Sequence, residues 1–193
     1  MDIISNKIGI LALFLTMLGI SASPHPFVLI FTYLIHELGH IIFATHLGAR
    51  LKKFKIGAFK LCISYDTSEL SYLKELLVCF GGIVFNLISA IIVAILPIFK
   101  GEVSDFFIIC NFSLAIMNLY PISVLDGGGI LRSTLMIITN EEKSEKICRG
   151  VSLICVLIMW LASVYLQLVF SSNLSMFFIS VVLLIEFCFS LIK

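Results

Sequence analysis

The sequence predicts an all-α membrane protein that crosses the bilayer several times, with about six transmembrane helices and a small β-hairpin after the second. Of its 193 residues, 60% are hydrophobic and 13% are charged, against about 25% charged in a typical soluble domain. The mean hydropathy is +1.14, so lipid is the solvent that suits this composition. The apolar residues also fall into segments of roughly the 20 residues that a helix needs to cross hydrocarbon. These segments run over 8–22, 27–47, 73–98, 106–119, 151–170 and 176–192.

The first segment, residues 8–22, permits two interpretations. Lys7, the apolar run and Ser21-Ala22-Ser23 are typical of a signal peptide. Pro24 would directly follow the cleavage point, which is unfavourable for a peptidase. We therefore expect the segment to be retained as a first helix.

The second segment, residues 27–47, carries the sequence His36-Glu37-Leu38-Gly39-His40. Helix positions four apart differ by about 40° in projection, so both imidazoles lie on one face and can bind one zinc ion. Glu37 can then act on a water molecule at the metal without being a ligand. Each ionisable group inside a membrane span costs about 2.5–3.5 kcal/mol. Three of them within one short motif therefore indicate a functional site.

Residues 52–65 alternate between apolar and polar side chains, with Gly57-Ala58 in a position to form a two-residue turn. This pattern predicts a β-hairpin. The alternative is an irregular basic loop that lies on lipid headgroups.

Basic residues indicate the orientation, since cytoplasmic connections are rich in Lys and Arg. Six spans with both termini in the cytoplasm place all basic residues except Lys100 on the cytoplasmic side. The net charge of +1 gives no reason to expect a nucleic-acid partner.

Asn86 in the third segment, 73–98, and Asn118 in the fourth, 106–119, are polar groups in apolar helices. Such residues can form hydrogen bonds between helices. They can also hold a substrate backbone or an oxyanion beside a metal. The sequence leaves both interpretations open.

Asp126 is the best candidate for a third metal ligand, because catalytic zinc is usually bound by three protein groups. It lies between Pro121 and Gly127-Gly128-Gly129, where irregular backbone can approach a buried site. The alternative is that Asp126 is the N-cap of a helix over 130–139. His46 has a suitable spacing in sequence, but on an uninterrupted helix it lies about 240° round from His40.

The last two segments, 151–170 and 176–192, carry no candidate site residue. We expect one membrane-embedded domain over 1–193, with a catalytic core over about 27–139 and accessory helices over 1–26 and 148–193. The six cysteines are scattered and are expected to remain thiols.

The chain resembles the site-2 protease family of intramembrane zinc metalloproteases. His36-Glu37-Leu38-Gly39-His40 is similar to one family motif, and Asn118-x-x-Pro121-x-x-x-x-Asp126-Gly127-Gly128 to a second. Gly81 to Asn86 is similar to a third, with Ile83 where the family often has Pro. The layout of six spans is most similar to the bacterial sporulation branch, which processes a pro-sigma factor.

The resemblance implies one Zn²⁺ per chain, held by His36, His40 and Asp126, with Glu37 as the general base. It also implies hydrolysis of a peptide bond in or near a transmembrane segment of a membrane-tethered protein. The expected partners are then the lipid bilayer and the membrane-tethered substrate, and the resemblance leaves room for a regulatory protein. Three alternatives stay open at this point: a prenyl-protein type membrane metalloprotease, a zinc transporter, and an inactive scaffold of the same fold.

Overall fold

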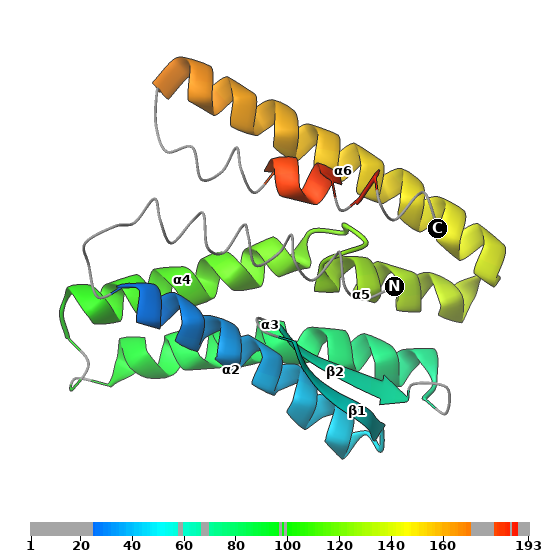
Figure 1. Cartoon of the computed structure of the whole chain (residues 1–193), viewed down its shortest axis with the longest axis horizontal. Coiled ribbons are helices and arrows are strands. Elements are labelled where there is room, and N and C mark those ends of the chain that lie inside the picture. Colours follow the sequence, from blue (N-terminus) through cyan, green and yellow to red (C-terminus); the bar gives the residue numbers. More distant parts are fainter. Residues whose placement is uncertain are drawn as a thin grey trace.

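The computed structural model describes residues 25–57, 60–66, 70–96, 98, 100–170, 180–185 and 187–188. Figure 1 shows them as a layered bundle of helices with a hairpin at one end. The elements are α2 (His25–His46), β1 (Arg50–Gly57), β2 (Lys60–Asp66), α3 (Tyr72–Ile95), α4 (Glu102–Leu119), α5 (Asp126–Ile138) and α6 (Glu141–Phe170). The first apolar segment, 8–22, lies outside the described residues, as does much of the last one.

Four helices of the described part are long and apolar enough to cross a membrane: α2, α3, α4 and α6. Large apolar side chains are exposed along them, such as Phe27 at 78% and Leu168 at 78%, which fits contact with lipid tails. The chain is thus an integral membrane protein. The predicted number of six spans is not supported, because four such helices are found and the other two segments fall wholly or largely outside the described residues.

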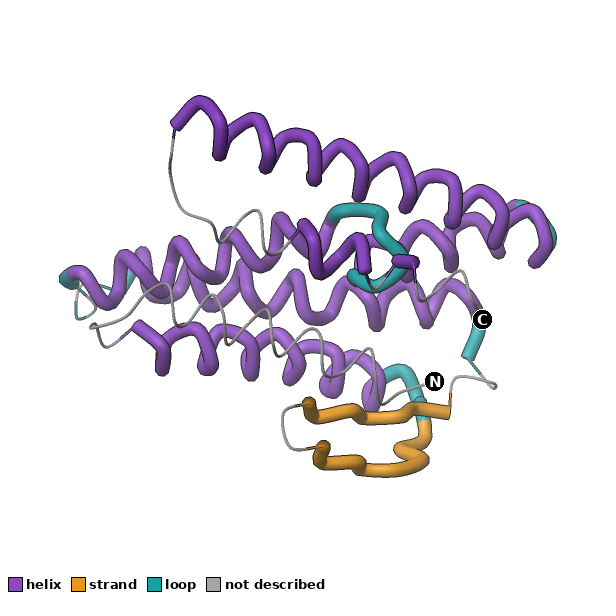
Figure 2. The backbone as a smooth tube through the Cα atoms, turned by 45° about the horizontal axis from the view of Figure 1, so that its top comes forward, coloured by secondary structure: helices purple, strands orange, loops and turns teal. Residues whose placement is uncertain are grey.

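The segment between α2 and α3 contains two antiparallel strands, where alternation of side chains predicts a hairpin. Ile56 pairs with Leu61 and Phe54 with Ile63, and the register shifts between Leu51 and Lys53. Figure 2 shows the hairpin beside the C-terminal end of α2, at one edge of the helix bundle.

Helix α3 lies at the centre of the described bundle and contacts α2, α4 and α5. It approaches α2 closely at Gly39 and Gly81, where an added Cβ on either residue would collide with the backbone of the other. Small residues of this kind let two helices pack backbone to backbone in a membrane.

A buried polar network joins α2, α3 and α4. The side-chain amide of Asn111 donates to Thr32 Oγ1 at 3.2 Å, and its Oδ1 accepts from Ser89 Oγ at 3.1 Å. Asn111 is fully buried. Such hydrogen bonds each contribute about 0.6 kcal/mol to helix association in membranes, and they fix how the three helices meet.

Helix α6 packs against the connection between α4 and α5. Ile122 of that connection is fully buried in a cluster with Val156, Leu183 and Phe187. The connection is also hydrogen-bonded to Ser152 of α6, whose Oγ donates to the Pro121 carbonyl and accepts from the Ser123 N–H. These contacts hold the backbone that leads into Asp126.

Candidate metal centre

His36 and His40 lie one turn apart on α2 and face the interior of the bundle. His36 is only 4% exposed, although an imidazole is a polar group. The Nε2 atoms of the two rings are 3.2 Å apart. The four-residue spacing therefore places both nitrogens at one point, as the sequence predicts.

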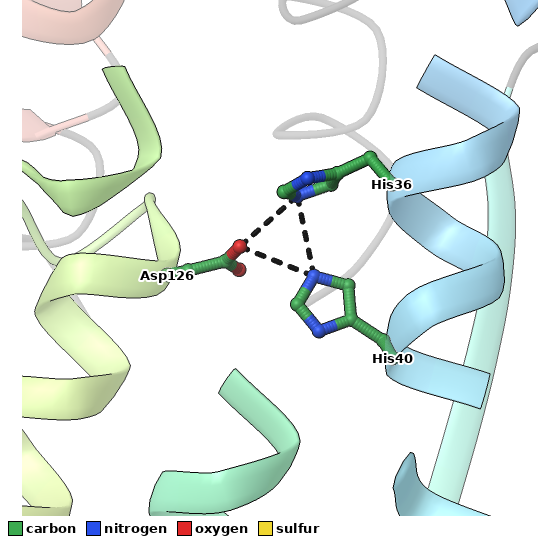
Figure 3. A group of neighbouring side chains, drawn as sticks. All are labelled: His36, His40 and Asp126. Carbon is green, nitrogen blue, oxygen red and sulfur yellow. Dashed lines mark hydrogen bonds and ion pairs between the residues drawn. The ribbon is translucent and has the colours of Figure 1, made fainter. Parts of the chain in front are cut away.

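Asp126 brings a carboxylate to the same point from the other side of the bundle. Its Oδ2 lies 3.0 Å from His36 Nε2 and 3.1 Å from His40 Nε2, as Figure 3 shows. Asp126 is the first residue of α5, and the N-cap is Leu125. The alternative that Asp126 is an N-cap is thus wrong, because its side chain points to the histidines.

The donor atoms of these three residues fit a zinc ion. One ligand atom from each lies within 4.8 Å of the others, and Asp126 Oδ2 is buried without a hydrogen-bond partner among the described residues. A zinc ion at this point would accept a lone pair from each of the three groups. In tetrahedral zinc with bonds of about 2.1 Å, neighbouring ligand atoms are about 3.4 Å apart. The separations of 3.0 to 3.2 Å need only a small adjustment to reach it.

The other nitrogen of each imidazole also has a partner, both from α3. His40 Nδ1 donates to the Val78 carbonyl at 2.8 Å. His36 Nδ1 lies 3.3 Å from the side-chain amide of Asn86. Partners of this kind fix the orientation of ligating histidines.

Glycines let the backbone of neighbouring elements approach the site. A Cβ at Gly82 of α3 would lie 2.5 Å from His40 Nε2 and 2.6 Å from His36 Cε1. A Cβ at Gly129 of α5 would lie 2.6 Å from Cys79 Sγ of α3. Gly129 thus allows α5 to pack close to α3.

Three other candidates lie outside this cluster. Glu37 follows His36 on α2 and is partly exposed. His46 is exposed, and its Nδ1 donates to the carbonyl of Ile42 in its own helix. Asn118 is buried, and its amide donates to the Leu114 carbonyl of its own helix at 3.0 Å. The structure therefore groups Asn86, but neither His46 nor Asn118, with the histidines.

The sequence does not point to Val78 or Ser152, and it includes Gly82 only as a member of the motif from Gly81 to Asn86. Val78 contributes its backbone carbonyl, and every residue has one. Gly82 contributes space, because a side chain at this position would collide with the imidazoles. A buried serine in an apolar helix is a weak signal that could have drawn attention to Ser152. In each case the role depends on which helix packs opposite.

Comparisons with known proteins give two findings. A family model described as "Peptidase family M50" matches residues 100–162, about a third of the chain, which includes Asp126 but not the two histidines. The fold is similar to that of a solved structure, "Site-2 Protease from Methanocaldococcus jannaschii", with a TM-score of 0.64 and 21% identity over 93% of this chain and 83% of that one. No curated protein sequence matches the chain.

These findings confirm the resemblance to the site-2 protease family, in the family model for residues 100–162 and in the fold for most of the chain. Neither bears on the sporulation branch.

Proposed function

We propose that this chain, with the fold of a site-2 protease, is an intramembrane zinc metalloprotease. It would hydrolyse a peptide bond in or near a transmembrane segment of a membrane-tethered protein. The observation that carries the proposal is the convergence of His36, His40 and Asp126 at one buried point, within helices apolar enough to cross a membrane. The family model of a peptidase, which spans Asp126, supports the same activity.

His36, His40 and Asp126 would hold the zinc ion. When bound, zinc supplies Lewis-acid chemistry that activates water and polarises a carbonyl. Three protein ligands leave a position open for reactants, which is typical of catalytic rather than structural zinc.

Glu37 would be the general base. It accepts the proton of the attacking water and passes it to the leaving amine. Its place on α2 directly after His36, with the side chain partly exposed, leaves it free for this exchange. Asn118 is proposed as a contact of the substrate backbone, since it is the buried polar group of α4 closest in sequence to the Asp126 connection.

The substrate class follows from the location of the site. A protein that is tethered to the same bilayer can diffuse to a buried site, and a regulatory protein such as a pro-sigma factor belongs to this class. A zinc transporter or an inactive scaffold of the same fold is the competing function. Neither of these requires a general base beside the metal.

Glu37→Gln tests the proposal, because an amide keeps the shape of the side chain and cannot accept the proton. Parent and variant would be co-expressed with candidate single-span substrates, and the cleaved fragment measured by immunoblot. We expect the variant to keep its zinc and to lose cleavage by about 100-fold or more. Zinc movement across the membrane without any Glu37-dependent cleavage would favour the transporter instead.

A further inference from the structure

The carboxamide of Asn86 lies beside a proposed metal ligand. Asn86 is fully buried, and its Nδ2 lies 3.3 Å from Nδ1 of His36. Its Oδ1 is buried with no hydrogen-bond partner among the described residues. A buried amide oxygen without a partner costs about 1–3 kcal/mol, so the position of this group requires an explanation.

His40 shows what a ligating histidine needs on its other nitrogen. Its Nδ1 faces the Val78 carbonyl at 2.8 Å, and a carbonyl can only accept a hydrogen bond. The proton of His40 is therefore on Nδ1. The lone pair is on Nε2, the atom that lies 3.1 Å from Asp126 Oδ2.

The same requirement applies to His36, whose Nε2 lies 3.0 Å from Asp126 Oδ2. A metal on Nε2 leaves the ring proton on Nδ1, which then needs an acceptor. The amide of Asn86 offers either a donor or an acceptor, since a half-turn about its terminal bond exchanges Nδ2 and Oδ1. With Oδ1 toward His36, the amide of Asn86 accepts a hydrogen bond from His36 Nδ1. The Val78 carbonyl accepts the equivalent hydrogen bond from His40 Nδ1.

We propose that Asn86 is a positioning residue that accepts a hydrogen bond from His36 Nδ1 and so directs His36 Nε2 to the metal. This inference rests on the proposed function, because it takes His36 to be a zinc ligand. It replaces the expectation that Asn86 holds a substrate or an oxyanion. An amide that is hydrogen-bonded to a metal-binding histidine changes the affinity for zinc even when no substrate is present.

Zinc affinity, measured by competition with a chelator in detergent, tests the role without a substrate. Asn86→Leu keeps the number and branching of the side-chain heavy atoms but has no acceptor, and Asn86→Ala is a smaller variant that also lacks one. Asn86→Asp restores an acceptor of the kind that commonly pairs with ligating histidines. Ser163→Ala is the control, since that buried hydroxyl bonds to the Trp160 carbonyl and to Ser180 and to none of the proposed ligands among the described contacts. Circular dichroism shows which variants are folded.

We expect Asn86→Leu and Asn86→Ala to raise the zinc Kd by about 10- to 100-fold, while Asn86→Asp and Ser163→Ala stay within about threefold of the parent. The visible spectrum of the cobalt-substituted protein should shift in Asn86→Leu and stay unchanged in Ser163→Ala. A parental Kd in both Asn86→Leu and Asn86→Ala would overturn the inference, even if cleavage is lost. An Asn86→Asp variant as weak as Asn86→Leu would overturn it too. A parent protein that binds no zinc would contradict the proposed function as well.

Discussion

Asp126 is the one proposed ligand that does not lie on α2, so it determines whether two histidines become a three-ligand site. Its carboxylate reaches both Nε2 atoms within 3.1 Å. The sequence predicts this trio because helix geometry pairs the histidines and zinc chemistry requires another ligand. It does not predict the contact between Asn86 and His36, since that depends on how α3 packs against α2.

Asp126→Ala should therefore lose most of the zinc that the parent binds, which we expect to be about one ion per chain. His36→Ala and His40→Ala should behave in the same way. His46→Ala is the control and should keep its metal, because His46 is exposed and bonded to its own helix. Elemental analysis of purified protein gives the measurement. Full zinc content in Asp126→Ala would exclude Asp126 as a ligand.

Gly82 offers a second test at this scale, because its missing side chain makes room for both imidazoles. In Gly82→Ala the new methyl group would lie 2.5 Å from His40 Nε2, so the rings must leave the positions in which they meet Asp126. We expect zinc affinity to fall by about tenfold or more, while the helix itself gains from the better propensity of Ala. Gly150→Ala is the control, since a Cβ there meets nothing within 4 Å. Equal zinc affinity in the two variants would contradict this account of Gly82.

Among the helices, hydropathy locates the apolar part of each one. It does not predict the residue at which the helix begins. Helix α6 starts at Glu141, whereas the apolar run starts at 151, because the polar turns before it continue the same helix. Helix α5 starts at Asp126 rather than at 130. Glycine is a poor helix former, so the sequence gives little sign that the run after Asp126 is helical. Close packing against α3 and against the end of α4 explains it.

The accessory helix α6 contributes to the site through Ser152, which binds the connection before Asp126. Ser152→Ala removes the hydrogen bonds to Pro121 and Ser123, so we expect lower stability by about 1 kcal/mol together with weaker zinc binding. Ser163→Ala removes a hydrogen bond of α6 to Ser180, which is far in sequence from the ligands. It should cost similar stability and leave zinc affinity unchanged. Thermal unfolding and chelator competition measure the two effects, and equal zinc affinities would show that Ser152 does not position Asp126.

At the scale of the whole molecule, the spanning helices alternate in direction through the bundle (Figure 1). The C-terminal end of α2 and the N-terminal ends of α3 and α6 therefore lie at one end of the molecule, with the hairpin, whereas α4 ends short of it, beside the start of α5. Most basic residues of the described part belong to elements or connections at this end, including Lys74, Arg132 and Lys143. Lys100 is at the other end, beside Glu102 and Asp105. His40 lies six residues before the end of α2 at His46, so about 9 Å from the basic end at 1.5 Å per residue.

The basic end should face the cytoplasm, because positive charge is retained on that side, and water for hydrolysis should reach the site from there. Two cysteine substitutions at exposed positions test this orientation with a thiol reagent that does not cross membranes. Lys143→Cys at the start of α6 should react from the cytoplasmic face, and Ile98→Cys, 79% exposed between α3 and α4, from the outer face. The parent, with its own cysteines, measures background labelling. The reverse pattern would place the basic connections outside. Water would then have to reach the site from the outer face, and substrates would have to present their scissile segment on that side.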